Sequence, residues 1–298
     1  MKTFLIYFYF LCCSLGYAQI ALSNHFPTLQ PSHIIDEKLT NISFALSMRV
    51  VESNYNGPLI RLRRDSDNAV RDFWFADNDI VDVAAIDAWR GNANVFVVIW
   101  YDQSGLGRNA TQNTNAFQPQ FITDPSRPYF VGDGTNDRLD INTSIQVLTN
   151  AGVNGSIFTV IFSTSNNQFS MGTRRPGNSR DRWSIHLNWT DNNVYFDSGF
   201  CCIENVRSAQ NPNNQWQQLS FIRANIIQSI RRSGVELNSG NYTQNPCTAT
   251  NNFGILYANG INNEFANNRF TEIIMYNTDI ELSDIQEIEE NQITFWNL

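Results

Sequence analysis

The 298-residue sequence is poor in charged residues, histidine and cysteine. Charged side chains make up 16% of the chain, and acidic residues outnumber basic ones to give a net charge of −8. A negative balance disfavours nucleic acid and anionic lipid surfaces as partners. The three histidines are His25, His33 and His186, and neither they nor the five cysteines have a spacing that suits zinc. No cofactor is therefore expected.

Long apolar runs are also missing, apart from one near the start of the chain. Phe4 to Leu15 is apolar, follows the positive Lys2 and precedes the small residues of Gly16-Tyr17-Ala18. This pattern is typical of a secretory signal peptide, and the run is too short for a membrane helix. We predict a signal peptide over residues 1–18, a leader over 19–37 and one domain over 38–298. The protein is then secreted, extracellular or periplasmic, without membrane insertion.

Three cysteines lie beyond the predicted signal peptide, namely Cys201, Cys202 and Cys247. An oxidising compartment favours a disulfide, and an odd number leaves one thiol over. Two pairings are open. Either neighbouring cysteine bridges to Cys247, or Cys201 and Cys202 bond to each other.

From Val95 onward, short alternating or apolar segments are separated by turns rich in Asn, Gly and Pro. This pattern predicts an all-β sandwich or barrel. The expected strands are 95–101, 128–131, 137–141, 156–164, 182–189, 193–197, 216–223, 226–231, 253–258 and 269–277. The strand 156–164 is apolar on both faces, so we expect it in the centre of a sheet.

Three segments have helical spacing of their apolar residues. They are 41–52, 79–89 (ended by Gly91) and 282–296, where Ser283 and Gln286 form a capping-box pattern. An alternating strand, 59–64, lies between the first two. We expect those two helices and that strand to form a distinct N-terminal portion of the domain.

Several polar and aromatic residues are candidates for binding a sugar. Asp102, Gln103 and Asn109 follow an apolar strand, and their side chains can hydrogen-bond hydroxyl groups. In a competing interpretation Asp102 caps the turn that follows it and pairs with an arginine. Trp189 could stack on a sugar ring, although it shares the parity of Trp183, which favours burial of both in the core.

The sequence "DGTND" has the density of side-chain oxygens that a calcium site needs. Its candidate ligands are Asp133, Asn136 and Asp137. A tight turn between two strands explains the same residues, so bound calcium is one of two interpretations.

Two stretches in combination resemble a known enzyme family. "YNGPLIRLRRDSDNA" (Tyr55 to Ala69) and "VVIWYDQSGLGRNATQ" (Val97 to Gln112) are similar to the N-terminal half of the α-L-arabinofuranosidase B catalytic domain. "YFVGDGTNDRLDI" and "RFTEIIMYNTDIELSDIQEIEENQ" resemble laminin-G-like modules of the concanavalin type. The similarities run from about residue 38 to the end. They imply a concanavalin A-like jelly-roll sandwich of two antiparallel sheets with short peripheral helices.

The resemblance also implies retaining glycosidase chemistry, which needs a nucleophilic and a protonated carboxyl about 5–5.5 Å apart. The family's nucleophile position falls within "RWSIHLNW" (Arg182 to Trp189), which holds no acid. Its general-acid position falls within "GILYANGINNE" (Gly254 to Glu264), whose loop supplies Asn259, a further candidate sugar ligand. The acids that could substitute are Asp181, Asp191 and Glu264.

Three functions follow from these features. The first is a secreted domain that binds plant or algal polysaccharide and is related to the arabinofuranosidases. The second is an active α-L-arabinofuranosidase that releases terminal arabinofuranose with relocated carboxyls. The third is a surface adhesion module that binds protein.

Overall fold

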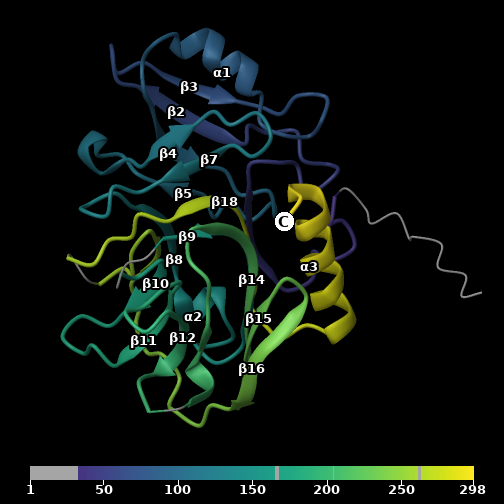
Figure 1. Cartoon of the computed structure of the whole chain (residues 1–298), viewed down its shortest axis with the longest axis vertical. Helices are drawn as coiled ribbons and strands as arrows, with labels where there is room; N and C mark the ends of the chain where they lie inside the picture. The colour runs from purple at the N-terminus through teal and green to yellow at the C-terminus, as the bar shows by residue number, and fades with distance from the viewer. Residues whose placement is uncertain (1–32, 165–167, 204, 261–262) are drawn as a thin grey trace, which may run out of the picture. The chain divides into compact units, whose positions relative to one another are not determined.

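The computed structural model describes residues 33–164, 168–203, 205–260 and 263–298 (Figure 1). The predicted signal peptide, 1–18, and residues 19–32 of the predicted leader lie outside the described residues. The described end of that leader is packed, because Ile34 and Ile35 are buried beside Val51 and Ile285. Within the described ranges, no helix has both the length and the apolar character to cross a membrane.

One series of antiparallel strands runs through the middle of the chain and its C-terminal part. Its order is β16 (Val235–Asn241), β15 (Ile227–Arg232), β14 (Gln215–Ala224), β9 (Gly155–Ser163), β18 (Arg269–Tyr276) and β1 (Ile42–Ser47). The predicted central strand is β9, and its position between β14 and β18 confirms that prediction. Neighbours on both edges and apolar packing on both faces explain why it is apolar throughout.

A second antiparallel series carries the remaining long strands. Its order is β13 (Ser208–Gln210), β12 (Asn193–Phe200), β11 (Asp181–His186), β10 (Met171–Arg174), β17 (Asn252–Ile255), β8 (Leu139–Ser144), β5 (Ala110–Thr111), β4 (Val95–Trp100), β2 (Ile60–Arg64) and β3 (Val70–Phe73). Short β6 (Gln120–Ile122) and β7 (Tyr129–Val131) connect β4 to β18.

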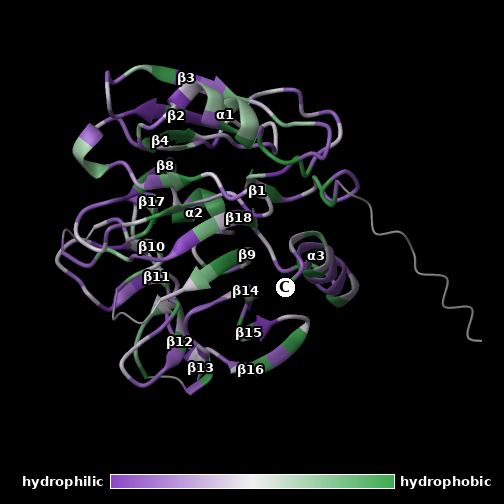
Figure 2. Cartoon of the chain, turned by 45° about the horizontal axis from the view of Figure 1, so that its top comes forward, coloured by the Kyte–Doolittle hydropathy of each residue, from purple (hydrophilic) through white to green (hydrophobic). Residues whose placement is uncertain are grey.

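The two series face each other across the core. The ring centroids of Phe196 on β12 and Phe221 on β14 are 5.6 Å apart, and those of Phe44 on β1 and Phe253 on β17 are 6.1 Å apart. These contacts join strands of different series, as the layers of a sandwich do. The hydrophobic stretches of β4 and β9 stand out in Figure 2. The predicted all-β sandwich of antiparallel sheets is confirmed.

The prediction of a helix over 41–52 is wrong, because this segment contains β1, which pairs with β18. Phe44 and Leu46 enter the main core while Ala45 packs in a second apolar cluster on the other face. Burial of both faces produced apolar spacing that imitates a helix. The expected distinct N-terminal portion is wrong for the same reason, since β1 is built into the sheet with the C-terminal strand.

The other two helices are confirmed with changed boundaries. The helix α1 (Val83–Arg90) begins after Asp82, whose carboxylate accepts the Ala85 N–H at 2.9 Å. The helix α3 (Leu282–Trp296) begins after Glu281, so the predicted capping box at Ser283 is wrong. A short helix, α2 (Ile145–Leu148), and the strands β3, β5, β6, β10, β13 and β16 were not expected from the sequence.

A buried ion pair fastens α3 and β1 to β18. Arg49 Nε lies 2.7 Å from Glu272 Oε2, and both side chains are fully buried. Ser47, Gln292 and Trp296 donate further hydrogen bonds to the Glu272 carboxylate at 2.9 to 3.1 Å. Burial acts to raise the pKa of Glu272, but Arg49, Trp296 and Gln292 hold it below its usual range.

We expect Glu272→Gln to lower the free energy of unfolding by about 3–5 kcal/mol, because it removes the carboxylate that faces a buried guanidinium. Chemical denaturation measures this change. Asp87→Asn is the matched control, since Asp87 pairs with Arg90 on the exposed face of α1. Its expected loss is below about 1 kcal/mol. Equal losses in the two variants would contradict the prediction.

Candidate functional site

The register of three strands directs one set of polar side chains away from the core. Trp183 and Ile185 of β11 point inward, so Arg182, Ser184 and His186 point outward. On β12, Asp197 and Tyr195 pair with Ser184 and His186 and share their face. On β10, Arg174 pairs with Arg182. The outer face of these strands therefore collects arginine, histidine and tyrosine.

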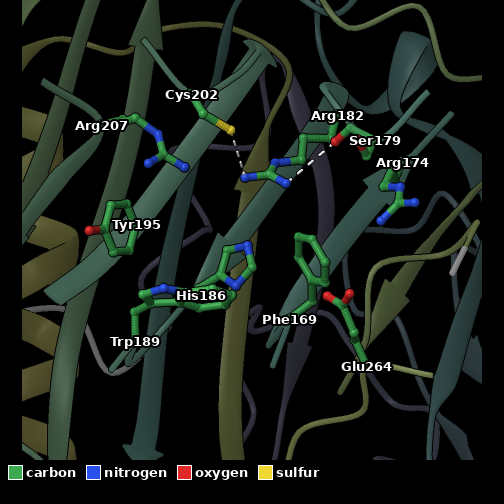
Figure 3. A pocket seen from close by; sticks show the side chains of 10 residues that line it. All are labelled: Phe169, Arg174, Ser179, Arg182, His186, Trp189, Tyr195, Cys202, Arg207 and Glu264. Carbon is green, nitrogen blue, oxygen red and sulfur yellow. Dashed lines mark hydrogen bonds between the residues drawn. The ribbon is translucent and has the colours of Figure 1, made fainter. Parts of the chain in front are cut away.

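A pocket of about 370 Å³ lies over this face. Its other residues come from the loops around the strands and from the 3-10 turn η2 (Asn205–Arg207). The complete lining is Phe169, Arg174, Ser179, Arg182, His186, Trp189, Tyr195, Cys202, Arg207 and Glu264 (Figure 3).

Four rings form a row across the pocket. The ring centroids of Phe169 and His186 are 3.9 Å apart, those of His186 and Trp189 5.0 Å, and those of Trp189 and Tyr195 6.4 Å. Figure 3 shows the three guanidinium groups along one side of this row. The pocket thus combines apolar ring surface with a strip of hydrogen-bond donors.

A buried carboxylate beneath the pocket holds two of these arginines. Asp197 is fully buried, and its Oδ2 accepts from Arg182 Nη2 at 2.6 Å while its Oδ1 accepts from Arg207 Nε at 2.6 Å. Burial acts to raise the pKa of Asp197, but the charges of Arg182 and Arg207 hold it below its usual range. Asp197 therefore stays ionised and serves as an anchor for both guanidinium groups.

Arg174 differs from these two arginines. Its backbone is fixed, since its N–H donates to the Asn259 carbonyl at 2.7 Å. Its guanidinium has no ion pair with any described residue, and its buried Nε has no hydrogen-bond partner among them. Glu264 is the one carboxylic acid among the described lining residues, and it lies outside ion-pair distance of Arg174.

His186 is a buried polar group that faces the pocket. It is 3% exposed, and neither ring nitrogen has a well-formed hydrogen bond with a described residue. A weaker interaction with the backbone of Gln168 acts to raise the pKa of the ring. Burial lowers the pKa of His186 to about 3, and the charge of Arg182 adds to the effect. The imidazole is thus neutral at physiological pH and has one donor and one acceptor.

The cysteine alternatives are resolved in favour of the neighbouring pair. Cys201 and Cys202 form a disulfide, and Cys247 is a buried free thiol whose pKa burial raises to about 12. Cys202 lines the pocket, and Arg182 Nη2 donates to its sulfur at 3.4 Å. The disulfide therefore forms part of the pocket wall.

Trp183 on β11 and Trp189 in the turn after it differ in burial. Trp183 is buried in the core as the alternation predicts. The expected core burial of Trp189 is wrong, because β11 ends at His186 and Trp189 begins the turn to β12, where its N–H donates to Asn193. That turn brings Trp189 into the pocket beside His186.

Asp102, Gln103 and Asn109 lie apart from the pocket. The Asp102 carboxylate accepts backbone N–H groups of Ala45, Ser104 and Arg108 at 2.8 to 3.0 Å. Gln103 bonds the backbone of Arg49 and Val51, and Asn109 accepts the Asp102 N–H. These bonds confirm that Asp102 caps its turn, and its contact with an arginine is to the backbone N–H of Arg108 rather than to a guanidinium. Sugar binding by the three residues stays a prediction that their contacts do not support.

The remaining acids that could substitute are placed differently from Glu264. Asp181 is 4% exposed and accepts hydrogen bonds from the backbone and hydroxyl of Thr248. Asp191 accepts from Asn193 and from the Tyr195 hydroxyl at 2.5 Å, so it adjoins the pocket without lining it. Asn259 donates to Asp140 at 2.8 Å, and its contribution is the backbone carbonyl that positions Arg174.

The calcium candidates form a tight turn between β7 and β8. Asp133 Oδ1 accepts the backbone N–H groups of Thr135, Asn136 and Asp137 at 2.7 to 3.2 Å. Burial and the charge of Asp133 raise the pKa of Asp137 to about 7. Among the residues that the structure describes, no cluster of three or more His, Cys, Asp or Glu could hold a metal ion. Calcium binding stays a prediction.

Arg174, Arg182, Arg207 and Phe169 were not identified from the sequence. Arg182 shares the parity of His186 in "RWSIHLNW", a signal that could have placed it on the outer face. Arg207 had no such signal, because its role depends on a turn that brings it to Asp197. Arg174 was missed because β10 was not recognised as a strand.

Comparisons with known proteins bear on the fold. No protein family and no curated protein matches the sequence. A crystal structure of an arabinofuranosidase complexed with arabinofuranosyl-α-1,2-xylobiose has a TM-score of 0.71 at 17% identity, over 90% of this chain. A GH54 α-L-arabinofuranosidase soaked with a cyclic sulfate inhibitor gives 0.70 at 18% identity, over the same share. This chain spans 65% of the length of each.

At this identity the likeness establishes a shared β-sandwich fold. It also matches the family that "YNGPLIRLRRDSDNA" and "VVIWYDQSGLGRNATQ" resemble. The two stretches to which that resemblance assigns catalytic acids meet at the pocket. Arg182 to Trp189 supplies Arg182, His186 and Trp189, and Gly254 to Glu264 supplies Glu264. The chain is therefore a β-sandwich that shares its fold with these arabinofuranosidases, and the described lining of its pocket contains one carboxylic acid, Glu264.

Proposed function

We propose that this protein is a secreted carbohydrate-binding domain and that the pocket over β10, β11 and β12 is its sugar site. The observation that carries the proposal is the row of rings from Phe169 to Tyr195 beside three guanidinium groups. Ligand pockets typically combine aromatic walls with a few directed polar groups. Plant or algal polysaccharide is the proposed ligand class.

The polar groups of the pocket suit sugar hydroxyls. The neutral His186 can donate one hydrogen bond and accept another, as a hydroxyl does. Its buried nitrogens, which lack well-formed partners in the described structure, would gain them from a ligand. Trp189 and Tyr195 offer half-buried ring surface on which the C–H face of a sugar can pack.

The chemistry of the lining favours binding over hydrolysis. A retaining glycosidase needs one ionised and one protonated carboxyl about 5–5.5 Å apart. Among the described lining residues Glu264 supplies one carboxyl. Asp197 cannot supply the second carboxyl, because its carboxylate is ion-paired with two arginines that hold its pKa low.

An active α-L-arabinofuranosidase is the second candidate function, and the fold likeness supports it. In this case Glu264 provides one carboxyl, and Asp191, which accepts a hydrogen bond from the pocket residue Tyr195, is a candidate for the other. Secretion is part of both proposals. The Cys201–Cys202 disulfide supports it, because disulfides persist in oxidising compartments.

We expect the full-length mature protein to bind a subset of glycans on a plant and algal array, with the Kd of the best ligand measured by calorimetry. Trp189→Ala removes a ring from the row and should weaken binding about 10-fold or more, equivalent to about 1.4 kcal/mol. Trp74→Ala removes a tryptophan that is 48% exposed on the segment after β3, away from the pocket, and should leave the Kd unchanged.

The same preparation separates the two candidate functions. The binding proposal predicts no arabinose release from arabinan or an aryl arabinofuranoside. Turnover that disappears in Glu264→Gln would instead establish the enzyme. A protein that binds no glycan and releases no sugar would contradict both.

We expect the affinity for a neutral sugar to be flat between pH 5.5 and 8. The pKa of His186 is lowered to about 3, so its imidazole stays neutral throughout this range. A histidine with an ordinary pKa, about 6.5, would gain a proton and lose its acceptor as the pH falls through that value. Calorimetric titrations at several pH values test this. An inflection near pH 6.5 that is absent in His186→Gln would show the prediction to be wrong.

A further inference from the structure

The pocket has an excess of positive charge. Arg174, Arg182 and Arg207 line it, and two carboxylates face them, namely Glu264 in the wall and Asp197 beneath. Three cations against two anions leave one positive charge unmatched among these groups. This excess is local, because the chain as a whole carries a net charge of −8. A neutral sugar needs no such excess.

Arg174 is the arginine of this set whose guanidinium is open to a ligand. Arg182 and Arg207 are both ion-paired with the buried carboxylate of Asp197, which holds their guanidinium groups in place. Arg174 has no described ion-pair partner, and its buried Nε has no described acceptor. An unpartnered guanidinium in a partly buried wall is costly to desolvate unless an acceptor reaches it.

We propose that the pocket recognises a sugar residue that carries an anionic group and that this group binds the Arg174 guanidinium. This inference rests on the proposed sugar site and names its ligand class. The planar fork of Arg174 suits a carboxylate or a sulfate oxygen pair. The sugar ring packs on the row of rings, and Glu264 accepts hydrogen bonds from its hydroxyls. A uronic acid and a sulfated sugar share this chemistry.

The other side chains of the pocket make the anion site directional. Arg182 lies over Phe169, with its guanidinium carbon 5.3 Å from the ring centroid, and Arg207 lies over Tyr195 at 4.5 Å. Both arginines are held at one side of the row by Asp197, and they extend the positive potential next to Arg174 (Figure 3). An anion is therefore attracted to that side and repelled by Glu264.

The test uses matched neutral, uronic acid and sulfated forms of the same oligosaccharides, with the mature protein and calorimetry. We expect at least one anionic form to bind about 10-fold more tightly than its neutral counterpart. Arg174→Gln should abolish this difference, measured as the ratio of the Kd values for the neutral and anionic forms in that variant. Arg174→Lys keeps the charge without the fork and should retain part of the preference.

Arg71→Gln is the charge-matched control. Arg71 lies exposed on β3, which is near the top of Figure 1, whereas β11 and β12 are near the bottom. The Arg71→Gln substitution removes the same unit of charge and should leave the anion preference intact. Thermal unfolding verifies that both glutamine variants are folded. Arg182 and Arg207 are unsuitable for this test, because replacing either one leaves the buried Asp197 carboxylate without one of its ion-pair partners.

The outcomes separate this inference from the proposed function. A preference for the uronic acid or for the sulfated form supports the inference and identifies the anion. Equal affinity for neutral and anionic forms overturns the inference and leaves the sugar site standing. An anion preference that survives Arg174→Gln also overturns it. Failure of every form to bind overturns both proposals.

Discussion

The buried carboxylate of Asp197 between Arg182 and Arg207 is the interaction on which the pocket depends. A carboxylate that is fully withdrawn from water is very costly unless it is paired and hydrogen-bonded. Asp197 meets this condition with four hydrogen bonds from two guanidinium groups. One arginine comes from β11 and the other from the turn η2, so the ion cluster joins the strand face to the loop that closes one side of the pocket.

This cluster also decides what chemistry the pocket can perform. A carboxylate that pairs with two arginines stays ionised and is shielded, so it can act neither as a proton donor nor as a free nucleophile. The neighbouring outward position on β11 holds His186, whose burial keeps it neutral. The strands that could present a pair of carboxyls to a sugar instead present fixed donors and rings. Such a surface can bind and orient a ligand without an acid and base pair to cleave it.

The fold was predictable from the sequence because alternation and turn residues report strand faces directly. The central strand β9 and the inward direction of Trp183 follow from apolar patterns alone. The pattern failed at 41–52, where both faces of β1 are buried and the apolar spacing imitates a helix. It failed again at Trp189, because strand parity ends where the strand ends.

The site was less predictable, since its groups meet through contacts that are distant in sequence. Arg207 reaches Asp197 from a 3-10 turn, and Arg174 faces the pocket because the Asn259 carbonyl fixes its backbone. The sequence emphasised Asp102 instead, whose polar neighbours turned out to be backbone amides of its own turn and of β1.

The contrast between the acidic chain and its positive pocket bears on specificity. A net charge of −8 repels polyanions at long range, although salt near 0.1 M screens this repulsion beyond about 10 Å. The guanidinium of Arg174 acts at short range and in a partly buried wall, where screening is weaker. An anionic chain therefore gains little by lying anywhere else on the surface. In the binding mode that we propose, one anionic sugar residue enters the pocket with its ring against the aromatic row. The acidic exterior and the guanidinium of Arg174 then together favour this site over the rest of the surface.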